Sequence, residues 1–389
     1  MKNDFDEILA RRGNGSLKWD DEYIQKRFQI TDTQKIYPLF IADMDFCMDQ
    51  GIKEKMLESL QNPDFGYFHV QDSFFESIVG WYQDIHQINI QKDWIVPSIG
   101  TISTLHLLCD MLAKDKGIVI MTPVYGPFLN CSKIGHPIEV PLLYENHRYH
   151  IDYQGLETQF QENDVKVLLI CHPHNPGGVM WSYDELERLV DLCKKYHVII
   201  LVDEIHGDLC LNNQFVSMIE LSSQYDQIIV STSPNKTFNI SGLTTSFVLC
   251  QNEDLRQRFV QYLDRLHISC NRLGLQMIEN VYTYGKEWYQ SLVEYIQSNM
   301  DMTKKYLDQN HIEYMEPDSG YLIWIRLDIE DIDKFVLDLA KETHVLIETG
   351  SRFVDYYQGW VRINIATSRH LIKEALELFV SYYQKYITK

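Results

Sequence analysis

Three segments of this 389-residue chain each place a reactive group directly after a run of apolar residues. Asn175 follows the run VKVLLIC (165–171), Asp203 ends the run VIILVD (198–203), and Lys236 follows the run QIIVST (227–232). In a parallel α/β sheet, ligands bind at the carboxyl ends of the strands. An amide, a carboxylate and an amine that meet there could hold an aldehyde cofactor. The amine would form a Schiff base with the aldehyde, and the carboxylate would keep a ring nitrogen protonated.

These groups match the demands of pyridoxal phosphate. Lys236 would carry the cofactor as a Schiff base and then shuttle protons, since a lysine in such a site has a lowered pKa. Asp203 would face the pyridine nitrogen, and Asn175 would donate to the phenolic oxygen of the ring. Tyr125, in TPVYGPF, could stack on the ring face. Residues 98–101, which enter a helix near residue 102, would offer backbone N–H groups and a helix dipole to the phosphate.

Alternating strand and helix patterns position these groups. Short apolar runs at 117–121, 165–171, 198–203 and 227–232 predict strands, and residues 102–114 predict a helix. Another helix opens at Ser182, whose spacing to Glu185 predicts a capping box. Because the strands are almost wholly apolar, they predict a parallel sheet that is buried on both faces. The fold class is therefore α/β, with a large domain built on a mostly parallel central sheet flanked by helices.

The C-terminal part of the chain has a different pattern. Long helical material at 273–309 is followed by strand patterns at 321–327 and 360–366 and by helices at 331–342 and 369–387. This pattern predicts a smaller α+β domain. We expect the large domain to span residues 46–285, and residues 1–45 and 286–389 to form the small domain.

Composition limits the classes of partner. The chain has 35 basic and 55 acidic residues, a net charge of −20, which argues against nucleic acid and anionic membranes. No apolar run reaches about 18 residues, and the N-terminus lacks the apolar segment of a signal peptide. The eight cysteines show neither CxxC nor zinc-site spacing. We therefore expect reduced cysteines, no metal and a cytoplasmic location.

Four short motifs carry a family resemblance. NPGG, DEIH, SPNKTFN and a late VRxN together resemble the fold-type I pyridoxal-phosphate enzymes, the aspartate-aminotransferase superfamily. The resemblance covers nearly the whole chain, from PLFIADMDF (38–46) to WVRINIA (360–366). Within the superfamily, the motifs ADMDF, FGY (65–67), DEIH and KTFN are most similar to the cystathionine β-lyase, or C–S lyase, branch.

The resemblance assigns expected roles to individual residues. It implies that Arg362 pairs with the substrate α-carboxylate, and that Tyr67 reaches the phosphate of a neighbouring subunit's cofactor. The protein would then be a homodimer with shared active sites. It also implies the roles given above for Lys236, Asp203 and Asn175. The residues expected to hold the phosphate are Gly100, Thr101, Ser233 and Thr232.

Two positions depart from typical aminotransferases. His206 replaces a tyrosine and Thr244 replaces a second phosphate-binding arginine, and both match the lyase branch. For His206, a structural hydrogen bond near the ring and proton transfer stay open. The expected reaction is β-elimination from cystathionine or another cysteine thioether, giving a thiol, pyruvate and ammonia. The alternatives are an amino-acid aminotransferase and a pyridoxal-binding regulatory protein. By analogy with the family, residues 11–20, 42–46 and 347–353 should line the entrance and set selectivity.

Overall fold

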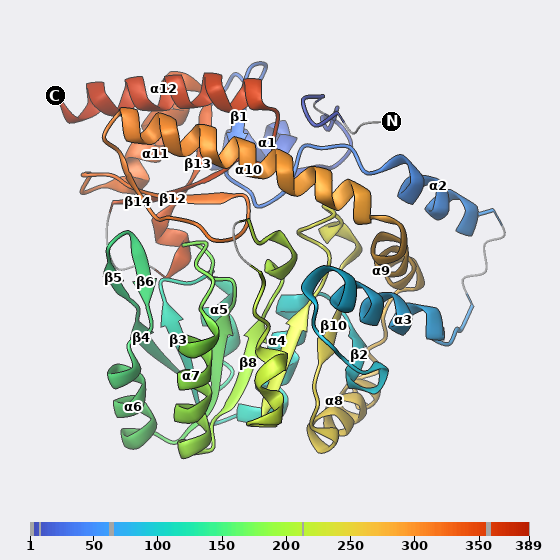
Figure 1. Ribbon diagram of the computed structural model, residues 1–389. Helices are drawn as coiled ribbons and strands as arrows, with labels where there is room; N and C mark the ends of the chain where they lie inside the picture. The colour runs from blue at the N-terminus through green and yellow to red at the C-terminus, as the bar shows by residue number, and fades with distance from the viewer. Residues whose placement is uncertain (1–3, 8, 62–65, 212–213, 355–358, 389) are drawn as a thin grey trace.

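The computed structural model describes residues 4–7, 9–61, 66–211, 214–354 and 359–388. Two large β-sheets, each with its own helices, make up the described chain (Figure 1). The helices are α1 (Asp21–Phe28), α2 (Gln50–Ser59), α3 (Asp72–Trp81), α4 (Thr101–Ala113), α5 (Pro127–Ser132), α6 (Tyr153–Glu162), α7 (Tyr183–Tyr196), α8 (Glu253–Arg265), α9 (Arg272–Tyr284), α10 (Lys286–Gln309), α11 (Ile332–Thr343) and α12 (Arg369–Ile387). The strands are β1 (Tyr37–Leu39), β2 (Ile95–Ser98), β3 (Gly117–Thr122), β4 (His136–Pro141), β5 (Leu143–Glu145), β6 (Arg148–His150), β7 (Val165–Cys171), β8 (Ile199–Asp203), β9 (Ile228–Thr232), β10 (Ser246–Leu249), β11 (Glu313–Tyr314), β12 (Leu322–Arg326), β13 (Val345–Thr349) and β14 (Trp360–Asn364).

The larger sheet has seven strands in the order β2-β10-β9-β8-β7-β3-β4. Strand β10 is antiparallel to both of its neighbours, while the other pairs are parallel. Alternate residues of one strand belong to different cores: Leu169 packs with α4 and α8, and Leu168 packs with α7. The sheet is therefore buried on both faces, which explains why its central strands are apolar at nearly every position. The predicted mostly parallel α/β sheet is confirmed.

The smaller sheet has five strands in the order β1-β13-β14-β12-β11. Strand β1 comes from the N-terminal region and runs parallel to β13, whereas the remaining pairs are antiparallel. Helices α10 and α12 run side by side above this sheet in Figure 1. The predicted boundaries at 45/46 and 285/286 would assign β1 and β11 to β14 to one domain, and these boundaries stay a prediction.

The predicted elements differ from the observed ones in a few places. The capping box of Ser182 and Glu185 is present at the start of α7, as expected. The helical stretch 273–309 is two helices that meet at Gly285. A Cβ atom at Gly285 would lie 2.5 Å from the ring of Phe238, so the closely packed break requires glycine. The sequence patterns did not predict the β5–β6 hairpin or the strands β1, β2, β4, β10, β11 and β13, nor the helices α1, α2, α3, α5, α6 and α8.

Within the described ranges, no helix combines the length and the apolar composition that a membrane span requires.

Candidate active site

The ends of three neighbouring strands bring the predicted reactive groups together. In the sheet register, Cys171 of β7 is opposite Asp203 of β8, and Asp203 is opposite Ser231 of β9. Asn175 follows the end of β7 by four residues, and Lys236 follows the end of β9 by four. The amide, the carboxylate and the amine all line one cavity of about 730 Å³. This is the arrangement that the sequence predicts for the carboxyl ends of parallel strands.

Further predicted residues reach the same cavity from other parts of the fold. Gly100 and Thr101 contribute from the start of α4, and Tyr125 and His206 from loops that follow β3 and β8. Arg362 comes from β14 of the smaller sheet. The cavity therefore lies where the two sheets meet, and its residues are far apart in the sequence.

A network of side chains behind Lys236 holds its turn in place. The hydroxyl of Thr237 donates to Asp208 Oδ2 (2.9 Å), and Asp208 Oδ1 also accepts from the indole N–H of Trp81 (2.8 Å). On the other side of the turn, Asn239 Nδ2 donates to the carbonyl oxygen of Met44 (2.9 Å). These bonds fix the backbone on both sides of the amine.

The environment of Lys236 makes its ammonium group easier to deprotonate. Its Nζ donates to the carbonyl oxygen of Ala42 (2.8 Å). Burial and, to a smaller extent, the charge of Arg362 lower the pKa of Lys236 to about 8, although the charges of Asp43 and Asp203 oppose the shift. At pH 7 a minor fraction of the chains, about a tenth, therefore carries a free, nucleophilic amine, and this fraction rises steeply toward pH 8.

Asp203 is a buried carboxylate that favours a cationic partner. It is 4% exposed and accepts a hydrogen bond from the Ile205 amide (3.1 Å). Burial raises the pKa of Asp203 to about 7, although the Ile205 bond and the charge of Lys236 lower it. A protonated ring nitrogen next to this carboxylate would relieve the desolvation penalty of its charge.

Arg362 and Asn175 form a buried pair in the cavity wall. Arg362 Nη1 donates to Asn175 Oδ1 (2.9 Å), and the guanidinium lies 4.6 Å from the ring centre of Phe353. Burial lowers the pKa of Arg362. Its Nε has no hydrogen-bond partner among the described residues. The pair is thus fixed in orientation, while the guanidinium keeps a donor for an anionic ligand.

The start of α4 has the form of an anion site. Gly100, the residue before the helix, has φ of +74°, which favours glycine. Behind it, the first-turn residues of the helix line the cavity, and Thr101 Oγ1 is buried without a hydrogen-bond partner in the described part of the chain. Ser241 and Thr244 form the facing wall. Helix N-terminal amides and hydroxyl groups together suit a phosphate.

Tyr125 and His206 flank the cavity with different degrees of burial. Tyr125 is 39% exposed, and burial raises the pKa of its hydroxyl while Arg362 and Arg352 lower it. His206 is buried, which lowers the pKa of its ring to about 3, and the charges of Lys236 and Arg362 act in the same direction. His206 is therefore neutral near pH 7, so it can donate or accept a hydrogen bond there as a neutral ring.

Two of the residues that were predicted to hold the phosphate of this chain's own cofactor do not line this cavity. The hydroxyl of Ser233 donates to the carbonyl oxygen of Thr245 (2.8 Å), and Thr232 Oγ1 donates to the carbonyl oxygen of Glu204 (3.1 Å). Backbone carbonyl groups nearby accept the hydrogen bonds of both hydroxyl groups. Ser233 and Thr232 are therefore not among the residues that line the cavity next to Gly100 and Thr101. Their predicted contact with a phosphate stays a prediction.

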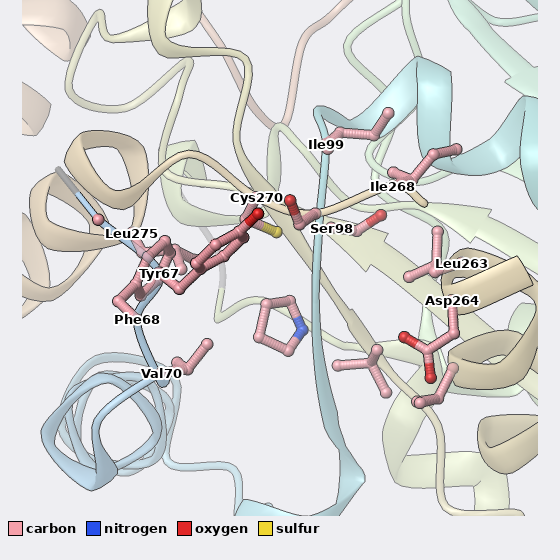
Figure 2. Close-up of a pocket in the computed structure, with 15 residues that line it drawn as sticks. Tyr67, Phe68, Val70, Ser98, Ile99, Leu263, Asp264, Ile268, Cys270 and Leu275 are labelled. Atoms are coloured by element: carbon pink, nitrogen blue, oxygen red, sulfur yellow. The ribbon is translucent and has the colours of Figure 1, made fainter. Parts of the chain in front are cut away.

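Tyr67 lines a second cavity, of about 590 Å³, on the outside of the larger sheet. Figure 2 shows Tyr67 and Phe68 on one side of this cavity and Leu263 and Asp264 on the other. The Tyr67 side chain is fully exposed in the single chain. Ile99, which precedes Gly100 at the start of α4, lines both cavities. Phe65 of the predicted FGY motif lies outside the described residues.

The expected entrance segments contribute side chains as predicted, and other residues were missed. Leu17, Ala42 and Phe353 line the cavity, one from each of the ranges 11–20, 42–46 and 347–353. Arg27 and Ser241 also line it, and the sequence analysis named neither. Neither belongs to a motif with a local signal for binding. Their position depends on how α1 and the loop before β10 pack against the strand ends.

The unpaired groups of the cavity fit pyridoxal phosphate. A buried carboxylate with a raised pKa suits the ring nitrogen, an amine with a lowered pKa suits the aldehyde, and the unpaired Thr101 hydroxyl suits the phosphate. For metals the donor set is poor: within the described ranges, no cluster of three or more His, Cys, Asp or Glu side chains could hold an ion.

Comparisons with known proteins agree with this geometry. The family model described as "Aminotransferase class I and II" matches residues 44–379. A cystathionine beta-lyase, PatB of Bacillus subtilis, is 31% identical over 374 residues, which cover 94% of this chain and 95% of the relative.

Solved structures with the same fold include two that contain pyridoxal phosphate. The PLP-bound C-S lyase from Staphylococcus hominis has a TM-score of 0.90 at 27% identity, covering 98% of both chains. A PLP-bound putative aminotransferase from Clostridium difficile has a TM-score of 0.91 at 32% identity, covering 98% of this chain and all of the other. The chain therefore belongs to the aminotransferase class I and II family, in the branch that contains the cystathionine β-lyases.

Proposed function

We propose that this protein is a pyridoxal-phosphate-dependent carbon–sulfur β-lyase that acts on cystathionine or other cysteine thioethers. The observation that carries the proposal is the meeting of Lys236, Asp203 and Arg362 in one cavity, where desolvation shifts the pKa of each. The names of the relatives, a cystathionine beta-lyase and a C-S lyase, support the choice of reaction.

The chain's residues divide the task of holding the cofactor. Lys236 would attach to the aldehyde, Asp203 would hold a proton at the ring nitrogen, and Asn175 would donate to the ring oxygen from its Nδ2. Tyr125 would cover a ring face, and the start of α4 with Gly100 would receive the phosphate. When bound, pyridoxal phosphate supplies an aldehyde that condenses with amines and a ring that withdraws electrons from an amino-acid α-carbon.

The reaction then depends on where the chain holds and moves protons. Arg362 would bind the substrate α-carboxylate with two N–H groups, which fixes the α-carbon within reach of the amine. Lys236, with its lowered pKa, would remove the α-proton as general base. The C–S bond breaks as the thiolate leaves with the bonding electrons. With one water, the overall products are a thiol, pyruvate and ammonia.

The reaction can be tested with purified enzyme and cystathionine. We expect equal amounts of pyruvate and homocysteine to form without any added keto acid, and none with the Lys236→Ala variant. The alternative is an aminotransferase, which the name of the Clostridium difficile structure favours. An enzyme that forms no pyruvate alone, but transfers the amino group once a keto acid is added, would replace the lyase proposal with this alternative.

The proposal includes a homodimer with shared active sites. Tyr67 is fully exposed and does not line its own chain's catalytic cavity, so its predicted contact with a phosphate requires a second copy. The cavity that it lines is apolar and adjoins the catalytic cavity at Ile99. A second copy seated there would bring its own Tyr67 close to Gly100 and Thr101. Covering the exposed side chains of Phe68 and Val260 would favour the association.

A cytoplasmic location completes the proposal. All eight cysteines lie in the described part of the chain and none forms a disulfide. Five of them are buried, where a free thiol packs as a small apolar group. Unpaired cysteines are what a reducing compartment favours.

A further inference from the structure

Three charged side chains form a row at the rim of the catalytic cavity. Glu348 of β13 lies in the middle, Arg27 of α1 on one side, and Arg352 of the turn Gly350–Phe353 on the other. Arg27 Nη2 forms an ion pair with Glu348 Oε1. Arg352 Nη1 lies 3.7 Å from Glu348 Oε2, which is too far for a hydrogen bond. We call these three residues the rim triad.

The rim triad adjoins the residue that would bind the substrate α-carboxylate. Glu348 is the cross-strand partner of Arg362 in the antiparallel pair of β13 and β14. Side chains directly opposite in such a pair point to the same face of the sheet, with Cβ atoms about 5 Å apart. Tyr125 is near both arginines, because Arg362 and Arg352 each lower the pKa that burial raises. The rim triad would therefore lie close to a substrate whose α-carboxylate is bound by Arg362.

The cavity is rich in positive charge although the chain is acidic. Its lining includes four basic side chains (Arg27, Lys236, Arg352 and Arg362) and two acidic ones (Asp203 and Glu348). The chain as a whole has 35 basic and 55 acidic residues. In the proposed function, Lys236 is joined to the cofactor and Arg362 pairs with the α-carboxylate. The rim triad then keeps one positive charge that neither the cofactor nor the amino-acid portion of the substrate uses.

The two arginines of the rim triad differ in freedom. Arg27 is 16% exposed, its Nη1 donates to the hydroxyl of Tyr23 (3.0 Å), and its guanidinium lies 4.8 Å from the ring centre of Phe40. Arg352 is 55% exposed. Arg27 is therefore fixed as the partner of Glu348, while Arg352 can turn its guanidinium toward a ligand.

We propose that Arg352 provides a subsite for a carboxylate on the sulfur substituent of the substrate. The preferred substrates would be cysteine thioethers that end in an anionic group, with Arg362 binding the α-carboxylate and Arg352 the distal one. Glu348 holds Arg27 and faces Arg352, which limits the net charge of the subsite to one. This inference rests on the proposed lyase function and names its substrate class.

Two thioethers of the same shape test the subsite. S-(2-carboxyethyl)-L-cysteine has a distal carboxylate, and S-(2-carbamoylethyl)-L-cysteine replaces it with a neutral amide. We expect kcat/KM for the carboxylate to be about tenfold higher in the holoenzyme, which is the size of one charge-assisted hydrogen bond. The Arg352→Gln variant should reduce this ratio to about one, and Arg352→Lys should restore part of it.

Arg326→Gln is the matched control. Arg326 is also an arginine about half exposed, with its Nη1 3.5 Å from a glutamate, but it lies outside the catalytic cavity. Its substitution should leave the substrate ratio at the wild-type value. Dissociation constants from the change in cofactor absorbance on mixing should give the same ratios, independent of turnover.

The outcomes separate the two proposals. Equal pyruvate formation from both thioethers in the wild type, or a preference that survives Arg352→Gln, would overturn the subsite and leave the lyase intact. No pyruvate from either thioether or from cystathionine would overturn the lyase function itself. In that case a tenfold difference between the two dissociation constants would still support the subsite, and equal constants would remove it.

Discussion

The catalytic cavity and the cavity lined by Tyr67 share one residue and differ in nearly everything else. Ile99 lines both, and their volumes are similar, about 730 and 590 Å³. The catalytic cavity has six charged side chains in its described lining, and three of them (Asp203, Glu348 and Arg362) are buried, whereas the Tyr67 cavity has one, Asp264. Buried charges bind and activate a small polar ligand but destabilise the protein without it. An apolar, open lining gains free energy when another surface covers it.

The same contrast appears in how each cavity is built. The catalytic residues extend from the ends of β7, β8 and β9 and from β14, so rigid strands hold them. Tyr67 and Phe68 precede α3 in an exposed segment. A site that performs chemistry needs atoms fixed to within fractions of an ångström, whereas an association surface can adjust as it is covered.

The strongest test of the comparison removes the reactive group of the catalytic cavity. Lys236→Ala should lower kcat for cystathionine by about a thousandfold or more, because the general base and the attachment point are both lost. The visible absorbance of the attached cofactor should disappear as well. Lys334→Ala, a change at an exposed lysine outside the cavity, should alter neither. If the Lys236 variant kept its absorbance and turnover, the catalytic assignment would be wrong.

A second change tests how the catalytic cavity binds its substrate. Arg362→Lys removes the paired N–H groups but keeps the charge, so kcat/KM should fall by about a hundredfold, mostly through KM. The cofactor should stay bound, which its absorbance spectrum reports. An unchanged KM, or loss of the cofactor together with activity, would show that Arg362 does not bind the α-carboxylate.

The apolar cavity is tested by adding a charge to it. Val260→Asp places a carboxylate on α8 in the lining, and we expect it to weaken dimerisation by more than tenfold, because the contact would bury that charge. Sedimentation velocity over a range of protein concentrations measures the effect. Ile387→Asp is the matched control, since Ile387 is an exposed apolar residue away from both cavities. A monomeric wild type, or equal dissociation of both variants, would argue against this surface as the interface.

The smallest expected effect concerns the stability of the cofactor-free chain. Burial raises the pKa of Asp203 from its ordinary value to about 7, so the folded chain holds a proton that the unfolded chain releases. Stability from this group is therefore lost as the pH rises from about 4 to about 7. Asp203→Asn should raise the unfolding temperature by about 2 °C at pH 8, and by less at pH 5.

Thermal unfolding at the two pH values, without cofactor, measures that difference. Glu204→Gln is a useful comparison, because burial also raises the pKa of Glu204, to about 8, but Ser217 and Met218 already donate to its carboxylate. A stability gain for Asp203→Asn that is equal at both pH values would contradict the role assigned to its charge.

Much of the fold could be predicted because it is encoded locally. The strands β3, β7, β8 and β9 and the helices α4, α7, α11 and α12 appear within a residue or two of their predicted positions. Apolar periodicity and the capping box of Ser182 are properties of neighbouring residues. Gly285 shows the limit: the apolar pattern of 273–309 is helical throughout, and the close approach of Val281 and Phe238 to Gly285 appears only in the structure.

The sequence by itself determined which chemistry the site could perform. An amide, a carboxylate and an amine after successive apolar strands identify Asn175, Asp203 and Lys236, since parallel strands end at one edge of a sheet. Only the tertiary structure decided which other charges join them. Arg27, Glu348 and Arg352 meet because α1 and β13 pack against β14, and the hydroxyl of Ser233 turns to Thr245 rather than to the cavity. Contacts between residues that are distant in the chain depend on how the elements pack, and a local sequence pattern does not predict that packing.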